Sequence, residues 1–168
     1  MGRKVKKIYW AAPLFTQAER IWNKMCAEWL RAKGYRVILP QEEAEKHVRP
    51  DGSMDFDALA RDCYCCALES DAVAAVLDGP DPDSGTSMEA AFKIQHGGLV
   101  IGLRTDFRKA EDGELNAMFR LLTKVIYYSS LNQPYETLLV MLDEELQKLS
   151  VPEIPSPSFT IPLSEVKR

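Results

Sequence analysis

The fold is decided by Ala72-Val73-Ala74-Ala75-Val76-Leu77, an uninterrupted apolar run as long as one β-strand. A strand with one face in water alternates between apolar and polar residues, whereas a strand of a parallel sheet is covered on both faces and stays apolar throughout. A helical pattern precedes this run, and a loop rich in glycine and proline leads from it into a second helical pattern. The run therefore predicts a central strand of a parallel sheet, flanked by helices in the chain.

The rest of the chain repeats this alternation of strands and helices. Further strands are predicted at residues 5–10, 35–39, 99–103 and 125–128, and helices at 16–33, 54–70, 86–95 and 135–149. Thr16 and Glu19 form a capping box at the start of the first helix, and Ile21 and Met25 fall on its apolar face. We predict an α/β fold with a doubly wound, flavodoxin- or Rossmann-like, five-stranded parallel sheet and helices on both faces.

The 168 residues are predicted to form one α/β domain at residues 1–149 and a proline-rich C-terminal tail at 150–168. A chain of this length buries about 68–70% of the surface that its unfolded form exposes, so it can build a core without disulfides or metals. The tail carries Pro152, Pro155, Pro157 and Pro162. We expect it to be an extended arm that is either disordered or lies on a neighbouring subunit.

Charge and composition argue against several classes of protein. The 21 Lys and Arg residues and 25 Asp and Glu residues give a net charge of −4, and the pI is near 5.3. Proteins that neutralise nucleic-acid phosphates or an anionic membrane carry an excess of basic residues. The sequence shows no pattern of a secretory signal and no run of the roughly 18 apolar residues that a membrane span needs. We therefore expect a cytoplasmic protein with neither a nucleic-acid polymer nor a membrane as partner.

The cysteines and histidines do not form a metal-ligand pattern. Three of the four cysteines fall within four positions, which matches neither a disulfide framework nor the paired spacing of a structural zinc site. We predict that they are small buried apolar residues of a reducing compartment. His47 and His96 are predicted at the surface, and no metal or cofactor is expected. The cysteines are Cys26, Cys63, Cys65 and Cys66.

The loop after the central strand carries the strongest chemical signal. From Asp78 to Glu89 it holds three aspartates and one glutamate, without a lysine or arginine. The free N–H groups of a helix N-terminus suit a phosphate, but these carboxylates would repel one. Carboxylates accept hydrogen bonds from hydroxyl groups, so a hydroxyl-rich ligand fits better. Ligands of doubly wound sheets bind at the carboxyl ends of the strands where the strand order reverses, which is where we expect this loop.

Glu89 has two interpretations from sequence alone. Thr86 and Glu89 have the spacing of a capping box, so the glutamate could serve only to cap a helix. A glutamate in the first turn of a helix also has its pKa lowered by the helix dipole, and an ionised carboxylate is what a glutamate nucleophile requires. Both interpretations stay open at this point.

Five segments in the same order resemble the nucleoside 2-deoxyribosyltransferase family, and the resemblance covers roughly residues 4 to 148. The segments are KIYWAAPLFT (7–16), SDAVAAVLDG (70–79), DSGTSME (83–89), VIGLRTDFR (100–108) and LNAM (115–118). The resemblance implies transfer of 2-deoxyribose from one nucleobase to another with retained configuration at the anomeric carbon. It also implies a covalent deoxyribosyl-enzyme intermediate, which a second base then attacks.

The resemblance further implies the site residues. Glu89 would be the nucleophile, and the Tyr9 hydroxyl would hold it in one rotamer. Asp83 would bind the sugar hydroxyls, and Asn116 would reach the sugar site of an adjacent subunit. Taken alone, Tyr9 could be a core aromatic, Asp83 a loop cap and Asn116 a helix N-cap. The other predicted substrate-binding residues are Asp78, Gly85, Gln41, Phe15 and Met118.

The group that protonates the leaving base is less well defined. Family members place an aspartate eight residues before the aspartate that matches Asp71, and this position holds Cys63, one residue after Asp62. Either the helix has shifted its register and Asp62 protonates the leaving base, or another residue has taken over this role. One residue rotates a side chain by about 100° around a helix, so the difference matters. We take Asp62 as the expected acid.

The segment Arg104 to Arg108 follows the fourth strand and also has two interpretations. It could be a solvated loop with salt bridges, or a lid or subunit contact over the sugar.

The leading hypothesis is a nucleoside 2-deoxyribosyltransferase that acts on 2'-deoxynucleosides and nucleobases as a homo-oligomer with shared active sites. The alternatives are an N-glycoside hydrolase of nucleosides or deoxynucleotides, and a nucleoside-binding module without catalysis.

Overall fold

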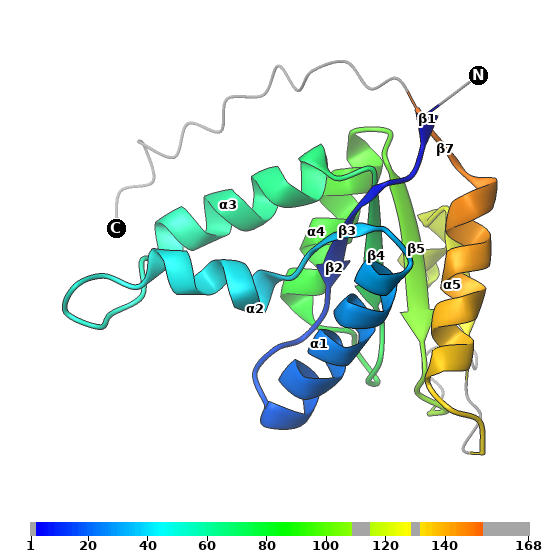
Figure 1. The fold of residues 1–168 in the computed structure, drawn as a ribbon, viewed down its shortest axis with the longest axis horizontal. Coiled ribbons are helices and arrows are strands. Elements are labelled where there is room, and N and C mark those ends of the chain that lie inside the picture. Colours follow the sequence, from blue (N-terminus) through cyan, green and yellow to red (C-terminus); the bar gives the residue numbers. More distant parts are fainter. Residues whose placement is uncertain (1–2, 109–114, 129–131, 153–168) are drawn as a thin grey trace.

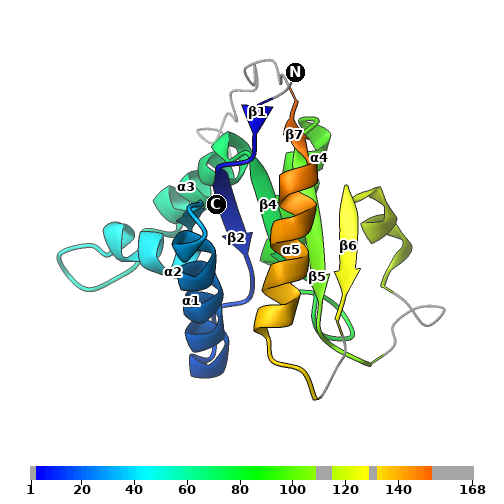
Figure 2. The ribbon, with the colours of Figure 1, turned by 45° about the vertical axis from the view of Figure 1, so that its right-hand side comes forward.

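The computed structural model describes residues 3–108, 115–128 and 132–152. Its centre is a parallel sheet (Figure 1) with the strand order β3-β2-β4-β5-β6, in which β6 lies beside β5 (Figure 2). This is the order of a flavodoxin-like doubly wound sheet, in which the winding reverses between β2 and β4. The predicted fold class is confirmed. The strands are β2 (Lys7–Ala11), β3 (Arg36–Ile38), β4 (Ala72–Val76), β5 (Leu99–Arg104) and β6 (Lys124–Tyr127).

Helices cover both faces of this sheet (Figure 2). α1 (Gln17–Ala32) and α5 (Glu136–Lys148) pack on one face, and α3 (Phe56–Glu69) and α4 (Ser84–Gln95) on the other. Trp10 of β2 joins the core under α1 and α5, whereas Tyr9 joins the core under α3 and α4. Every residue of β4 is buried, as predicted for a doubly covered strand. Within the described ranges, none of the helices is long and apolar enough to cross a bilayer.

The predicted capping box at the start of α1 is confirmed. The Thr16 hydroxyl accepts the Glu19 N–H at 3.2 Å, and the Glu19 carboxylate accepts the Thr16 N–H at 2.7 Å. Both of these N–H groups lack a partner inside the helix, so the side chains supply the missing acceptors.

The buried stripe of α1 differs from the prediction. Ile21 and Met25 are exposed, and Asn23 is buried in their place. Asn23 accepts the indole N–H of Trp10 at 3.1 Å and donates to the carbonyl of Pro13 at 2.8 Å. Because both ends of its amide have partners, the asparagine can be buried and can fix the loop after β2.

Several short elements were not predicted. α2 (Pro40–Glu43) and η1 (Ala44–His47) replace the polar loop expected after β3, and η3 (Ala117–Leu121) precedes β6. β1 (Arg3–Lys4) pairs antiparallel with β7 (Ser150–Val151), so the beginning of the predicted tail joins the N-terminal segment. Residues 153–168 of the predicted arm lie outside the described part of the chain.

Asp71 ties the N-terminal segment to the start of β4. Its carboxylate accepts hydrogen bonds from the Arg3 guanidinium and from the backbone N–H groups of Lys6 and Lys7, at 2.7 and 2.8 Å. Burial acts to raise the pKa of Asp71, but these bonds together outweigh it and hold the pKa below its ordinary value.

Replacing Asp71 with asparagine should therefore lower the free energy of unfolding at neutral pH by about 1–3 kcal/mol. Because the pKa is depressed in the folded state, this stabilisation is present above the ordinary aspartate pKa and is lost as the pH falls through the folded-state value. Urea titrations at neutral and acidic pH measure both effects. Arg3→Gln removes only the exposed partner and should cost less. A loss in Asp71→Asn that does not change with pH would contradict this account.

Candidate active site

Tyr9 of β2 and Glu89 of α4 meet where the strand order reverses, between β2 and β4. Tyr9 lies on β2 with 1% of its surface exposed, and Glu89 lies on α4, which follows β4. The Tyr9 hydroxyl donates to Glu89 Oε1 at 2.6 Å. A bond of this length to a carboxylate is a strong one, and it fixes the position of the glutamate oxygen.

The local structure of α4 decides between the two interpretations of Glu89. The helix begins at Ser84, and Asp83 is its N-cap, with Asp83 Oδ2 accepting the Thr86 N–H at 2.8 Å. Thr86 is therefore inside the first turn and Glu89 is in the second. The capping-box interpretation of Glu89 is wrong, because the cap lies three residues earlier than that interpretation requires.

Burial raises the pKa of Glu89 to about 7. The hydrogen bond from Tyr9 acts in the opposite direction, and the charge of Asp83 raises the pKa further. The sequence had suggested that the helix dipole would lower this pKa, and the structure shows the reverse because removal from water outweighs the other effects. Glu89 is therefore a carboxylate whose charge is poorly solvated, which favours its attack on an electrophile.

Tyr9 remains a hydrogen-bond donor at physiological pH. Burial raises the pKa of its phenol far above the ordinary value, and the nearby charges of Glu89 and Cys63 raise it further. The protonated hydroxyl can therefore orient Glu89 but does not serve as a base.

The structure places Cys63, and not Asp62, against this pair. Cys63 and Tyr9 each act on the pKa of the other. Asp62 points to another side of α3, where its carboxylate is bonded to His47 Nε2 at 3.0 Å and accepts the Cys66 thiol at 3.6 Å. The Asp62 carboxylate is thus engaged by His47 and Cys66, and its role as the acid stays a prediction.

The same region corrects two smaller predictions. His47 and His96 are half-buried rather than fully at the surface: the His47 side chain is 17% exposed and bonded to Asp62, and His96 Nδ1 lies 2.8 Å from the Phe92 carbonyl. The cysteines are free as predicted, but Cys26 alone is buried, while Cys63 and Cys66 are half-buried and Cys65 is exposed.

Asp83 and Gly85 lie at the start of α4 beside the pair. Asp83 caps the helix through one carboxylate oxygen, and its charge acts on Glu89. A Cβ atom on Gly85 would lie 3.2 Å from that oxygen, so the glycine leaves room around the Asp83 carboxylate. The capping interpretation of Asp83 is thus correct, and its carboxylate is also close enough to Glu89 to act on its pKa.

Asp78 has a different environment from Asp83 and Glu89. Its carboxylate accepts the Thr105 N–H at 2.6 Å, the Asp106 N–H at 2.9 Å and the Thr105 hydroxyl. Asp106 in return accepts the Gly79 N–H at 2.9 Å. These bonds connect the loops that follow β4 and β5, so Asp78 holds the loops together.

Arg104 strengthens the same connection and was not recognised from the sequence. It is 4% exposed, whereas Arg108 is exposed and pairs with Asp106 at 2.6 Å. The interpretation as a solvated loop with salt bridges therefore fits Arg108 and is wrong for Arg104. Its guanidinium donates to the carbonyls of Leu77, Gly79 and Arg108. A charged residue at the end of a strand gives no sequence signal for this role, because all three partners are backbone atoms.

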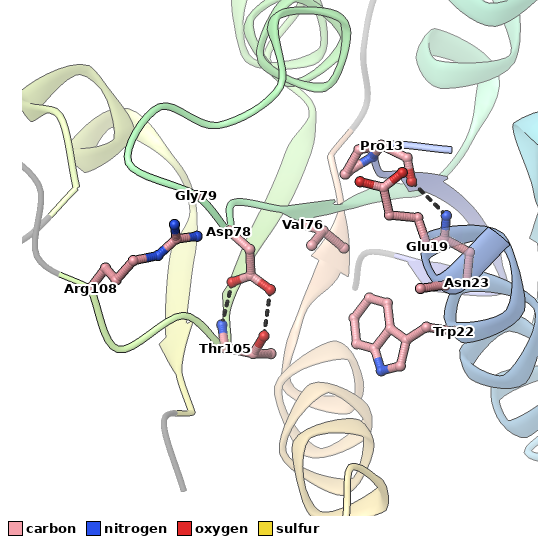
Figure 3. Close-up of a pocket in the computed structure, with 10 residues that line it drawn as sticks. Pro13, Glu19, Trp22, Asn23, Val76, Asp78, Gly79, Thr105 and Arg108 are labelled. Carbon is pink, nitrogen blue, oxygen red and sulfur yellow. Dashed lines mark hydrogen bonds between the residues drawn. The ribbon is translucent and has the colours of Figure 1, made fainter. Parts of the chain in front are cut away.

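A pocket of about 440 Å³ lies at this edge of the sheet, beside α1 (Figure 3). Pro13, Trp22 and Asn23 line it on one side, and Asp78 and Thr105 on the other. The described residues that line it do not include the tyrosine–glutamate pair, which belongs to the α3 and α4 side of the sheet.

The remaining predicted binding residues lie at the edges of this region. Phe15 is exposed in the loop after β2, and Gln41 donates to the Arg20 carbonyl at 2.9 Å while its own oxygen is buried without a partner among the described residues. Asn116 caps η3 by accepting the Met118 N–H at 3.0 Å, as its local interpretation predicts.

Where the chain is described, no group of three or more His, Cys, Asp or Glu residues is placed to hold a metal.

Comparisons with known proteins identify the family of this chain. The family model of nucleoside 2-deoxyribosyltransferase matches residues 8–145. The crystal structure of a conserved protein from Enterococcus faecalis V583 is 27% identical, with a TM-score of 0.66 over 84% of this chain and 99% of that chain. A comparison with curated proteins finds no match.

Two further structures share the fold. The 2-deoxyribosyltransferase from Bacillus psychrosaccharolyticus is 24% identical, with a TM-score of 0.58 over 79% of this chain and 95% of that chain. The CMP N-glycosidase from Clostridium botulinum is 20% identical, with a TM-score of 0.59 over 83% of this chain and 99% of that chain. Because the family model spans most of the sequence, the chain belongs to the nucleoside 2-deoxyribosyltransferase family.

Proposed function

We propose that this protein exchanges the base of 2'-deoxynucleosides through a covalent deoxyribosyl intermediate on Glu89. The observation that supports this most is the 2.6 Å hydrogen bond from the Tyr9 hydroxyl to Glu89 at the point where the strand order reverses. A carboxylate fixed in this way is suited to attack a carbon atom from one defined direction.

In the proposed reaction, a Glu89 oxygen forms a bond to the anomeric carbon while the bond from that carbon to the base nitrogen breaks. The electron pair of the broken bond leaves with the base, which takes up a proton. The transition state resembles an oxocarbenium ion, so a buried carboxylate below the ring stabilises the developing positive charge. A second base then attacks the anomeric carbon from the opposite side and releases Glu89. Two inversions give net retention of configuration.

The sugar is proposed to bind beside Asp83 and Gly85, where a carboxylate can accept hydrogen bonds from hydroxyl groups. The stretch from Asp78 to Glu89 contains no lysine or arginine, which favours a nucleoside over a nucleotide as substrate. Phe15 and Gln41 remain our proposed contacts to the base. Asp78 contributes indirectly, by holding the loop that leads into α4.

A product assay distinguishes this function from its alternatives. The protein is incubated with a deoxynucleoside or a deoxynucleotide, with and without an acceptor base, and the products are separated by chromatography. We expect a new deoxynucleoside only when the acceptor is present. Free deoxyribose at the same rate with and without acceptor would indicate an N-glycoside hydrolase instead. Bound nucleoside without any product would indicate a binding module.

The proposal includes a homo-oligomer. α4 and η3 leave between them an apolar groove of about 530 Å³, at which Met88, Met118 and Leu121 are exposed. A second copy of the chain would cover this surface and would bring Asn116, at the start of η3, to the edge of a neighbouring site. The four cysteines are free, which is typical of a reducing compartment, so we propose that the assembly is cytoplasmic. Its proposed role is the salvage of deoxynucleosides.

Leu121→Glu should therefore separate the subunits, because a charge would be buried in an apolar interface. Light scattering should give the mass of one chain, 19.0 kDa, for this variant and a multiple of it for the wild type. Base exchange should fall in parallel. Val140→Glu places the same change on an exposed position of α5 and should leave the mass unchanged. A wild type that is fully active as a single chain would contradict the proposal.

A further inference from the structure

α4 carries a lysine at a position that a helix packed on a core ordinarily gives to an apolar residue. The buried face of this helix consists of Thr86, Ala90 and Lys93, with Glu89 partly buried beside them. Lys93 is 1% exposed, and burial lowers its pKa to about 8. A lysine is almost never fully buried unless its ammonium group has partners, because removing the charge from water is costly. The burial of Lys93 therefore points to a specific role.

The partners of Lys93 are backbone carbonyls where α3 ends and β4 begins. Its ammonium group donates to the Leu68 carbonyl at 2.8 Å and to the Ser70 carbonyl. Leu68 lies in the last turn of α3, and Ser70 is its C-cap. The last carbonyls of a helix lack partners within the helix, and a cation is favoured there. Lys93 thus anchors α4 to the C-terminal end of α3.

The connection from α4 to β5 leaves room for the stem of this lysine. Gly98 lies just before β5, and its N–H donates to the Lys93 carbonyl at 2.9 Å. A Cβ atom on Gly98 would lie 2.3 Å from Cε and 2.5 Å from Cδ of Lys93, which is much closer than a normal contact between carbon atoms. The path of the lysine side chain to α3 therefore depends on a glycine at this position.

The anchor lies one helical turn from the proposed nucleophile. Glu89 and Lys93 are four residues apart on α4, so their side chains lie on the same face. Each is bound to a different element, because Glu89 accepts the Tyr9 hydroxyl of β2 at 2.6 Å while Lys93 binds the end of α3. A helix slides or turns as one body over a single turn. Holding Lys93 in place therefore limits how far Glu89 can move away from Tyr9.

We propose that Lys93 is a positioning residue for Glu89, which holds the carboxylate at the Tyr9 hydroxyl by fixing α4 to the end of α3. The inference rests on the proposed function and adds to it a residue outside the proposed substrate contacts. A displacement of about 1 Å at a reacting group can lower a rate by about 100-fold. Loss of the anchor should therefore appear in kcat.

Replacing Lys93 with methionine removes the ammonium donor and keeps an unbranched apolar stem, so the variant should fold. We expect kcat for base exchange to fall by roughly 10- to 100-fold. Lys24→Met removes an exposed lysine of α1 as a control, and its kcat should stay within about twofold of the wild type. Circular dichroism and thermal unfolding establish that each variant is folded.

A double-mutant cycle with Tyr9→Phe separates positioning from a general disturbance of the fold. If Lys93 acts by holding Glu89 at the Tyr9 hydroxyl, the anchor has little left to do once that hydroxyl is removed. The double variant should therefore be within about threefold of the slower single variant, whereas independent effects would multiply.

The pH profile of Lys93→Met gives an independent measurement. Glu89 must be ionised to react, so the rate falls at pH values below its pKa. The bond from Tyr9 lowers this pKa, and its loss in Lys93→Met should move the acidic limb to higher pH, as in Tyr9→Phe. Asp83 and Cys63, the other titratable groups that interact with Glu89 among the described residues, are unchanged in this variant.

Gly98→Ala tests the same anchor without removing the lysine. Its methyl group would displace the stem of Lys93, so kcat should fall by a factor similar to that in Lys93→Met. In a Lys93→Ala background the stem is absent, and Gly98→Ala should have no further effect on kcat.

The outcomes separate this inference from the proposed function. A folded Lys93→Met protein with kcat within about threefold of the wild type would overturn the inference and leave base exchange on Glu89 in place. Multiplied losses in the cycle with an unmoved acidic limb would overturn it too, as would unfolding of both Lys93→Met and Gly98→Ala, because Lys93 would then serve the fold alone. A wild type without base exchange would instead remove the proposed function, and the inference with it.

Discussion

Replacing Glu89 with glutamine should abolish base exchange, with a fall in rate on the order of 10⁴-fold or more. Glutamine has the same shape, and its side-chain oxygen can still accept the Tyr9 hydroxyl, but an amide does not form the covalent bond to the anomeric carbon. The rate is measured by chromatography of a deoxynucleoside incubated with an acceptor base. Asp81→Asn removes a carboxylate from the same loop outside the pair and should retain most of the activity.

Loss of folding is not expected to explain this result. The pKa of Glu89 is raised to about 7 in the folded protein, so the ionised form is destabilised relative to the unfolded chain. This cost appears as the pH rises above the ordinary glutamate pKa and is complete above about pH 7. Glutamine carries no charge, so the variant should unfold at the same or a higher temperature than the wild type at pH 8. Substantial activity in a folded Glu89→Gln protein would contradict the assignment.

Replacing Tyr9 with phenylalanine should lower the rate of base exchange by roughly 10- to 100-fold, which corresponds to losing one hydrogen bond to a charged group. The phenyl ring fills the same buried space, so the core of β2 is kept. Glu89 is retained, and a smaller loss than in Glu89→Gln is therefore expected. Tyr35→Phe is a matched control, because Tyr35 also donates to a carboxylate, that of Asp143, at 2.6 Å outside the site.

The pH dependence of the Tyr9→Phe variant gives a second measurement. Glu89 must be ionised to react, so the wild-type rate should fall as the pH drops below about 7. The hydrogen bond from Tyr9 lowers the pKa of Glu89, and its removal should shift this acidic limb to higher pH. A lower rate without any shift would mean that Tyr9 does not act through Glu89.

Features that depend on neighbouring residues in the chain were predictable. The unbroken apolar run at residues 72–77 identified a doubly covered strand, and Thr16 with Glu19 identified the start of α1, because both signals arise within a few residues. The position of Glu89 beside Tyr9 was not readable from periodicity. It required the resemblance to a family, since 80 residues separate the two side chains.

Features that depend on distant partners were missed. Asn23 fell outside the predicted apolar face because its partners, Trp10 and Pro13, belong to another element. Arg104 was indistinguishable from a solvated charge because it binds only carbonyls. Asp78 was grouped with Asp83 by proximity in sequence, although its oxygens are used to join two loops. In each case a side chain is satisfied by atoms whose position depends on the whole fold.

The most direct test of the central claim is to trap the intermediate on Glu89. A 2'-deoxynucleoside that carries fluorine at carbon 2 of the sugar slows the formation of the oxocarbenium-like transition states and allows the covalent species to accumulate. After incubation and digestion, mass spectrometry should find the mass of the fluorinated sugar on the peptide that contains Glu89, and no adduct in Glu89→Gln. An adduct on another residue, or base exchange and binding without any adduct, would contradict the account.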